Sequence, residues 1–300
     1  MARYTVSWHK LSREKLPMTT LLLVLISAVI VVIFRENQSA DNSTEVKVFS
    51  KLKEINPGQN FRLITQDKKT PTTEQPQISF CLRVPIILYH HIQPMKAAQE
   101  KNETTLTVDV KNFESQVAYL VSSGYKTIPV EQLAQALIKR QKLPSKTAII
   151  TIDDGYRDIY TYAYPIAKKY NVILNLMIPT GLIGREGFLS WHQLQEMVNS
   201  GLVFAYNHTW SHASLGSLSR KRAEAEILLA KQQLTSKLGR DVNIFAYPYG
   251  SKSDVVLDIL QSNGFIAGLT TSHGFNQCDT AIYTLHRNHI GNAPLSSYGL

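Results

Sequence analysis

From Cys81 to the C-terminus, short apolar runs alternate with stretches whose apolar residues recur at helical spacing. The runs are rich in β-branched and aliphatic residues, which is typical of short buried strands. Because amphipathic stretches separate the runs, the pattern predicts parallel strands with helical crossovers, arranged as a barrel or as a doubly wound sheet. The expected strands lie at 84–89, 147–152, 172–178, 202–206, 244–247, 265–269 and 282–285.

The amphipathic stretches predict the helices between these strands. The clearest is 220–238, where Ala223, Ile227, Ala230, Leu234 and Leu238 fall on one face and indicate a side that packs on the core. Glycine is a common stop just after a helix, and Gly239 stands in that position. The expected helices lie at 113–123, 131–141, 160–170, 191–200, 220–238 and 254–262.

The N-terminal 80 residues have a different pattern. Basic residues within 1–18 precede an apolar stretch at 19–34, and a polar stretch of mixed charge follows at 35–80. Positive charge before an apolar segment favours a cytoplasmic N-terminus and an exported remainder. We expect a signal anchor at 19–34 and a polar stalk at 35–80, with a cleaved signal peptide as the alternative. Residues 81–300 would then form an extracytoplasmic domain, attached to the membrane or secreted.

Polar residues gather directly after the predicted strands. In parallel α/β folds the carboxyl ends of the strands meet at one edge, and reactive groups collect there. We therefore expect one shared site, formed by His90-His91, Asp153-Asp154, Asn207-His208, Pro248-Tyr249-Gly250, Arg287 and His289.

Asp153 and Asp154 indicate the chemistry of this site. Adjacent carboxylates at the end of a buried strand are costly unless each finds a cation or a hydrogen bond. A metal ion would satisfy one carboxylate and leave the other free to move a proton. His208 and His212 stand four residues apart, so on a helical turn they would share one face and bind one ion. Two histidines and one carboxylate leave coordination positions open, which is typical of a catalytic metal site.

Three motifs together resemble those of a known family. Asp153-Asp154-Gly155, the segment 208–212 (His-Thr-Trp-Ser-His) and the segment 245–250 (Phe-Ala-Tyr-Pro-Tyr-Gly) are similar, in order and spacing, to motifs of the polysaccharide deacetylases. These form carbohydrate esterase family 4 and share the NodB homology domain. The resemblance covers 81–300 and implies a deformed (β/α)7-type barrel with parallel strands. It also implies a divalent metal, usually zinc, and hydrolysis of acetyl groups on glycans.

The resemblance also implies roles for individual residues. Asp153 matches the general base, and Asp154, His208 and His212 match the metal ligands. Tyr249 matches the residue whose backbone N–H helps to hold the oxyanion. The chemistry agrees with these roles, because a metal polarises the acetyl carbonyl, a carboxylate accepts a proton from water, and an N–H group stabilises the tetrahedral oxyanion.

The chain departs from the common family pattern at two places. A Leu-x-His usually stands near the end of the domain, whereas here Leu88-Tyr89-His90 stands at its start. This resembles the circularly permuted branch that includes the poly-β-1,6-N-acetylglucosamine deacetylases, and it implies His90 as the catalytic acid; a structural hydrogen-bonding role is the alternative. Ala246 replaces an arginine that orients the base in many relatives. We expect Arg287 to orient Asp153 instead, with binding of wall polymer or of another carboxylate as the alternative.

The predicted barrel also indicates where Cys81 and Cys278 lie. Each precedes a strand, and the first and last strands of a barrel are neighbours, so both cysteines would lie at the end opposite the catalytic face. A disulfide would fit an exported protein, and two free thiols are the alternative.

Composition narrows the choice of partner. The 300-residue chain has a formal net charge of +9, and a basic surface suits nucleic acid, anionic lipid or acidic polymers. Because the chain has no zinc-finger spacing and no aromatic RNA-binding signature, we expect no nucleic-acid partner. We predict a metal-dependent hydrolase that removes acetyl groups from an N-acetylglucosamine-containing polysaccharide outside the membrane. The alternatives are a non-catalytic glycan-binding protein on the same fold and an O-acetyl (xylan-type) carbohydrate esterase.

Overall fold

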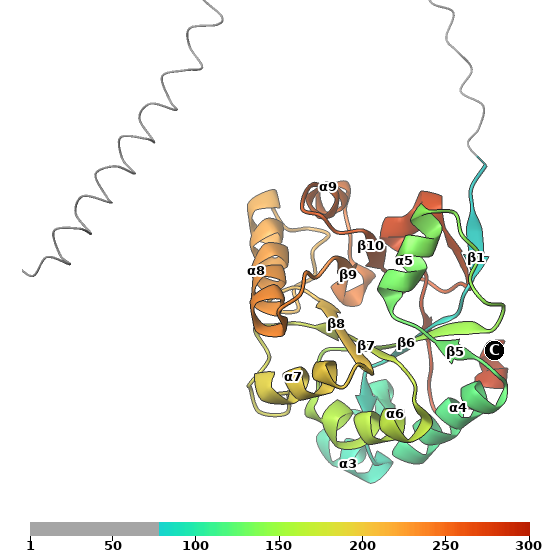
Figure 1. Cartoon of the computed structure of the whole chain (residues 1–300). Coiled ribbons are helices and arrows are strands. Elements are labelled where there is room, and N and C mark those ends of the chain that lie inside the picture. Colours follow the sequence, from blue (N-terminus) through green and yellow to red (C-terminus); the bar gives the residue numbers. More distant parts are fainter. Residues whose placement is uncertain (1–77) are drawn as a thin grey trace, which may run out of the picture. The chain divides into compact units, whose positions relative to one another are not determined.

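The computed structural model describes residues 78–300 (Figure 1). The predicted anchor at 19–34 and nearly all of the predicted stalk lie outside these residues. Within 78–300, no helix combines the length and the apolar character needed to cross a membrane. The α-helices are α3 (Met95–Lys101), α4 (Val110–Ser122), α5 (Val130–Ile138), α6 (Tyr164–Tyr170), α7 (Trp191–Asn199), α8 (Arg220–Leu238) and α9 (Asp254–Ser262).

The central element is an eight-stranded sheet in which every pair is parallel. Its order is β10-β9-β8-β7-β6-β2-β12, and β5 pairs with the start of β6. Helices surround the curled sheet (Figure 1), so the architecture is the predicted deformed (β/α) barrel. The strands of this sheet are β2 (Ile86–Tyr89), β5 (Lys126–Thr127), β6 (Thr147–Asp153), β7 (Leu174–Ile178), β8 (Val203–Asn207), β9 (Ile244–Ala246), β10 (Ala267–Leu269) and β12 (Asn288–His289).

The segment 285–290 links the two edges of this sheet. On one side, the Leu285 N–H donates to the Gly268 carbonyl (2.8 Å) beside β10. On the other side, β12 pairs in parallel with β2, and the Ile290 N–H donates to the Leu88 carbonyl (3.1 Å). The segment therefore lies between β10 and β2, and it includes Arg287.

The prediction of a last strand at 282–285 is wrong. Residues Asp279–Thr284 form a 3-10 helix, and the strand that completes the sheet begins later, at Asn288. Ile282 and Leu285 still pack against the core. The apolar spacing of this segment is therefore similar to that of a strand, and spacing alone led to the wrong prediction. The predicted helix at 160–170 also differs, because a π-helical turn at Ile159–Ala163 precedes α6.

Strand β6 shows how the sheet positions functional groups. All of its residues are buried, as expected for a parallel strand covered on both faces. Ile150 and Ile152 pack with the cluster of apolar residues that includes α4, α6 and α7. Ile149 lies in a different cluster, with α5. Side chains alternate along a strand, so Asp153 belongs to the face of Ile149 and points into the barrel.

Helix α8 has the predicted stripe, in which Ala223, Ile227, Ala230 and Leu234 are buried and Leu238 is partly buried. It ends at Gly239, whose φ of 68° is the left-handed conformation that glycine adopts without strain. Helix α7 begins with a capping box, in which Ser190 and Gln193 satisfy each other's backbone N–H groups. These local signals explain why both helices were predictable.

Cys81 and Cys278 form a disulfide. They are register partners in a separate two-stranded antiparallel sheet made of β1 (Cys81–Arg83) and β11 (Asn276–Cys278). The sequence did not predict β1 and β11. The expectation that the first and last strands of the barrel are neighbours is confirmed, because β2 and β12 pair in parallel. The structure also adds a short parallel pair, β3 (His91–Ile92) with β4 (Thr107–Val108), flanking α3.

Candidate active site

Asp153 and Arg287 form a buried ion pair at the carboxyl end of β6. The guanidinium donates to both carboxylate oxygens, from Nη1 to Oδ1 at 2.6 Å and from Nη2 to Oδ2 at 2.8 Å. The side chain of Arg287 is fully buried, and its Nε donates to the Thr270 carbonyl (2.8 Å). The contact expected between Arg287 and this carboxylate is therefore present, in the bidentate geometry that fixes a carboxylate most firmly.

The ion pair keeps Asp153 ionised despite its burial. Burial by itself would raise the pKa of Asp153, but the charge and hydrogen bonds of Arg287, together with His208 and His90, outweigh this effect, and the pKa lies below its ordinary value. Asp153 Oδ2 is also 3.7 Å from His208 Nε2. Asp153 is thus a fixed, charged carboxylate that can accept a proton.

Asp154, His208 and His212 form a compact group of candidate metal ligands. One donor atom from each lies within 4.8 Å of the others. Asp154 Oδ1 is 3.1 Å from His212 Nε2 and 3.6 Å from His208 Nε2. Burial tends to raise the pKa of Asp154, but hydrogen bonding to His212 and the nearby histidine charges lower it well below its usual range. A carboxylate and two imidazoles are suitable ligands for a divalent metal ion.

The two histidines do not lie on a helical turn, as the sequence predicted. They lie in an irregular loop after β8, and both Thr209 and His212 have positive φ (66° and 63°). This backbone conformation brings His212 back toward Asp154. The four-residue spacing therefore correctly indicated a shared site, although an irregular loop and not a helical turn brings the two histidines together.

Side chains outside the motif hold this loop in place. Asn207 Oδ1 accepts from the Thr209 N–H (2.9 Å), and its Nδ2 donates to the Ile227 carbonyl of α8 (2.8 Å). Glu226 of α8 accepts from the backbone N–H groups of Trp210 (3.1 Å) and Ser211 (2.8 Å). Hydrogen bonds to α8 thus hold the loop between the histidines. No pattern in the sequence indicated this role of Glu226.

The hydrogen bonding of His208 leaves Nε2 available as a ligand. Its Nδ1 lies 2.8 Å from the Ala246 carbonyl, which can only accept, so Nδ1 carries the proton. Burial lowers the pKa of His208 to about 4, against the opposing effect of the Asp153 and Asp154 charges. The imidazole is therefore neutral at physiological pH, with its Nε2 lone pair facing Asp154, as a metal ligand requires.

His90 and Tyr249 line the same pocket, whereas His91 and His289, which were also expected there, do not. A cavity of about 260 Å³ is lined by His90, Tyr249, Asp153, Asp154, His208 and His212, among others. His90 Nδ1 is buried and has no hydrogen-bond partner within residues 78–300, which argues against a structural hydrogen-bonding role for this nitrogen. The Tyr249 ring is exposed, its hydroxyl is hydrogen-bonded to His212 Nδ1 (3.1 Å), and its φ is 59°.

Leu106, Tyr156, Leu182 and Thr271 also line this pocket, and the sequence analysis assigned none of them to it. Tyr156 directly follows the Asp-Asp-Gly motif, so its position was a usable signal. Leu106 comes from a segment near β4 that no motif indicated. Leu182 lies in the segment 180–188, which the strand-and-helix pattern leaves as a loop after β7.

The comparisons with known proteins agree with this geometry. Residues 140–268 match the family described as polysaccharide deacetylase. A Bacillus subtilis protein with the provisional name polysaccharide deacetylase YxkH is 29% identical over 205 residues, covering 68% of this chain and 70% of that protein. A Staphylococcus aureus protein named poly-beta-1,6-N-acetyl-D-glucosamine N-deacetylase is 29% identical over 186 residues, covering 58% of this chain and 64% of that protein.

One relative is much longer than the region it shares with this chain. The Escherichia coli O157:H7 protein with the same name as the staphylococcal one is 25% identical, and the match spans 70% of this chain and 36% of that protein. Among solved structures, the Streptococcus pyogenes deacetylase PplD in complex with acetate superposes with a TM-score of 0.66 and 28% identity. This match covers 70% of this chain and 93% of that one.

Proposed function

Because the chain belongs to the polysaccharide deacetylase family, we propose that it removes N-acetyl groups from a β-1,6-linked N-acetylglucosamine polymer outside the membrane. Water and the acetamide would yield acetate and a free amine, with cleavage of the carbon–nitrogen bond. The observation that carries the proposal is the placement of an ionised carboxylate, Asp153, directly beside the donor group Asp154–His208–His212. The names of the staphylococcal and Escherichia coli relatives support the choice of polymer.

The donor group fits a divalent metal ion, and zinc fits best. Two imidazole nitrogens and one carboxylate oxygen are a common ligand set of catalytic zinc sites, which keep a position open for water or substrate. The proposal gives Asp154, His208 and His212 this role. A bound metal would polarise the acetyl carbonyl and make a bound water more acidic.

Asp153 is the proposed general base. Its Oδ2 is the oxygen nearer to the metal-ligand group, so this oxygen is placed to accept the proton of the attacking water. The bidentate pair with Arg287 orients the carboxylate and keeps it ionised, which is what a base requires before each turnover. Arg287 acts through Asp153, so it is a positioning residue.

His90 and Tyr249 supply the other two groups that the reaction needs. The departing amine must gain a proton, and His90 follows β2 at the pocket, with its Nδ1 unpaired within residues 78–300. The tetrahedral oxyanion needs a hydrogen-bond donor, and the backbone N–H of Tyr249 is the proposed one. Both assignments place the required group at the wall of one cavity.

The extracytoplasmic location rests on two independent features. The basic-then-apolar pattern of residues 1–34 is typical of an export signal or anchor. The Cys81–Cys278 disulfide is typical of proteins folded in oxidising compartments. Attachment to the membrane through 19–34 would hold the enzyme beside a polymer at the cell surface.

The experiment compares acetate release from three polymers: poly-β-1,6-N-acetylglucosamine, peptidoglycan and acetylated xylan. The full chain is used in detergent with added zinc, and the Asp153→Asn variant is the matched control. The proposal predicts the fastest release from the first polymer, abolished in the variant. Faster release from peptidoglycan or xylan contradicts the proposed substrate. Binding to a glycan without any release favours the non-catalytic reading.

A further inference from the structure

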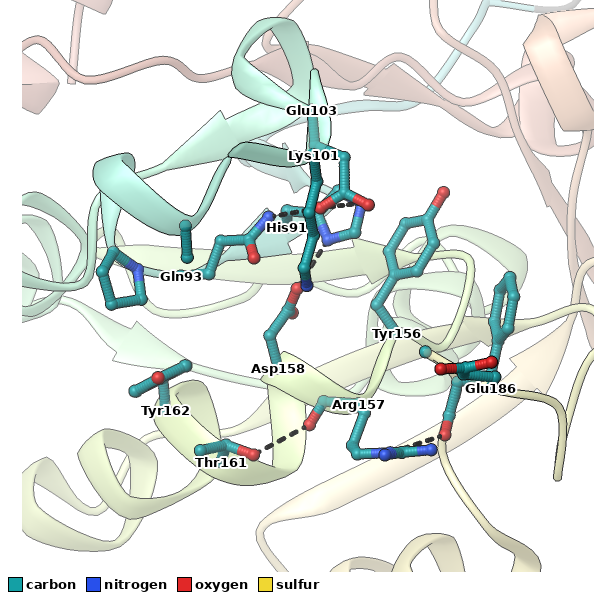
Figure 2. Close-up of a pocket in the computed structure, with 14 residues that line it drawn as sticks. His91, Gln93, Lys101, Glu103, Tyr156, Arg157, Asp158, Thr161, Tyr162 and Glu186 are labelled. Atoms are coloured by element: carbon teal, nitrogen blue, oxygen red, sulfur yellow. Dashed lines mark hydrogen bonds and ion pairs between the residues drawn. The ribbon is translucent and has the colours of Figure 1, made fainter. Parts of the chain in front are cut away.

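Tyr156, which lines the catalytic pocket, also lines a second cavity. Its volume is about 430 Å³, and Figure 2 shows polar side chains gathered around it. We call it the side cavity; its lining includes His91, Gln93, Lys101, Asp158 and Glu186. A smaller hollow of about 250 Å³ shares Leu106 and Tyr156 with the catalytic pocket and shares His91 and Glu103 with the side cavity. The three hollows are therefore adjacent to one another.

A stack of three rings lines the side cavity. The Tyr156 ring lies between His91 (centroids 3.6 Å apart) and Phe188 (5.2 Å). Backbone hydrogen bonds fix the loop that carries Phe188, because the Arg157 N–H donates to the Gly187 carbonyl (2.8 Å) and the Leu189 N–H to the Gly155 carbonyl (2.9 Å). This wall of the side cavity is therefore pre-formed, as ligand sites usually are.

The floor of the side cavity consists of polar groups that already have partners. His91 Nδ1 is 2.5 Å from Asp158 Oδ2, and Gln93 Nε2 donates to Glu103 Oε2 (2.7 Å). His91 and Gln93 are only 6% and 3% exposed. Buried polar groups that are held in this way keep a fixed orientation.

The rim carries exposed groups of both charges. Lys101 and Arg157 are basic, Glu186 is acidic, and Thr161 adds a hydroxyl. With Glu103 also at the cavity, opposite charges are close to balanced, so the site does not suit a polyanion. Mixed hydrogen-bonding groups beside aromatic rings suit an uncharged ligand that has many hydroxyls and apolar ring faces.

We infer that the side cavity is a binding subsite for sugar units that flank the unit being deacetylated. The inference rests on the proposed function, since the side cavity shares Tyr156 with the catalytic pocket and a flanking sugar would lie beside the sugar that reacts. One wall comes from residues 91–103, outside the matched range 140–268. The segment that includes β3 and α3 thus adds recognition of polymer length to the catalytic motifs.

The test measures binding of the β-1,6-linked N-acetylglucosamine dimer and pentamer by calorimetry. The zinc-loaded Asp153→Asn protein is used so that neither oligomer is turned over. The altered protein also carries Lys101→Ala and Glu186→Ala, which remove two rim groups. The matched control instead carries Lys139→Ala and Asp254→Ala; these exposed residues lie directly after α5 and in α9, and they do not line the side cavity.

The pentamer is expected to bind more tightly than the dimer. The rim variant should weaken pentamer binding roughly tenfold, leave dimer binding unchanged, and differ from the control. Equal binding of the two lengths, no binding of either, or a rim variant that behaves like the control overturns the inference. Acetate release by the wild type is measured in parallel, so an inactive protein contradicts the proposed function while binding still decides the subsite.

Discussion

Arg287 donates a hydrogen bond to each carboxylate oxygen of Asp153, although 134 residues separate them in the chain. The contact exists because the segment 285–290 lies between β10 and β2 and brings the guanidinium to the end of β6. A base that is both buried and ionised needs such a partner. The segment that closes the barrel therefore also supplies the partner that the proposed base, Asp153, requires.

Arg287→Met should reduce both stability and activity. The substitution leaves the Asp153 carboxylate buried without its partner, which costs about 3–5 kcal/mol of the free energy of unfolding. The pKa of Asp153 should rise, so less of the base is ionised at a given acidic pH. The acid limb of the pH–rate profile should then move to higher pH, and Arg287→Lys should restore part of the shift.

Arg140→Met is the matched control for this prediction, since Arg140 forms an exposed ion pair with Asp279 (2.9 Å). Exposed pairs contribute little to stability. We expect its pH–rate profile and its urea midpoint to stay close to those of the wild type. An Arg287→Met enzyme with an unchanged pH profile would show that Arg287 does not control the base.

Glu226→Ala should weaken zinc binding although Glu226 is not a proposed ligand. Its carboxylate holds the backbone N–H groups of Trp210 and Ser211 between the two histidines. Loss of such a supporting group typically lowers metal affinity about 10- to 100-fold. Competition with a chromophoric chelator measures the affinity, and Glu224→Ala, also on α8, is the control. Equal affinities for the two variants would refute the supporting role.

His90→Gln should slow amide hydrolysis far more than hydrolysis of an activated ester. An amine leaving group needs a proton, whereas p-nitrophenolate leaves without one, so only the amide reaction depends on the acid. We expect kcat for an N-acetylglucosamine oligomer to fall about 100-fold. His192→Gln, on the surface of α7, is the control. A similar loss on both substrates would mean that His90 does not act as the acid.

Removing the disulfide should destabilise the domain without changing its chemistry. Cys81 and Cys278 are 197 residues apart, and closing so long a loop stabilises by about 5 kcal/mol in the chain-entropy treatment, although real bridges often contribute less. Cys81→Ser with Cys278→Ser should therefore lower Tm while kcat at low temperature stays unchanged. Calorimetry measures Tm, and acetate release measures kcat. An unchanged Tm contradicts the prediction.

Much of the barrel was predictable because its signals are local. The run 147–152 consists of β-branched and apolar residues, and the stripe of 220–238 has clear helical spacing, so each element can be identified without knowing its neighbours. The last strand was not predictable in this way. Asn288–His289 is short and polar, and it becomes a strand only because β2 offers a free edge.

In the candidate site, too, some residues were predictable from local motifs and others were not. Asp153, Asp154, His208 and His212 were identifiable because they stand in short motifs at strand ends. The supporting contacts of Glu226 and the shared wall formed by Tyr156 depend on how distant segments pack. No spacing in the sequence encodes those contacts, and the left-handed residues of the 208–212 loop likewise follow from the tertiary fold.

The measurement that tests the central claim most directly is acetate release by metal-free and zinc-reconstituted protein, with zinc content determined for the same samples. Poly-β-1,6-N-acetylglucosamine is the substrate, and the wild type is compared with Asp153→Asn and His212→Ala. We predict that zinc restores activity to the wild type, that Asp153→Asn binds zinc but releases no acetate, and that His212→Ala loses zinc and activity together. Full activity in the metal-free protein, or in zinc-loaded Asp153→Asn, would contradict the account.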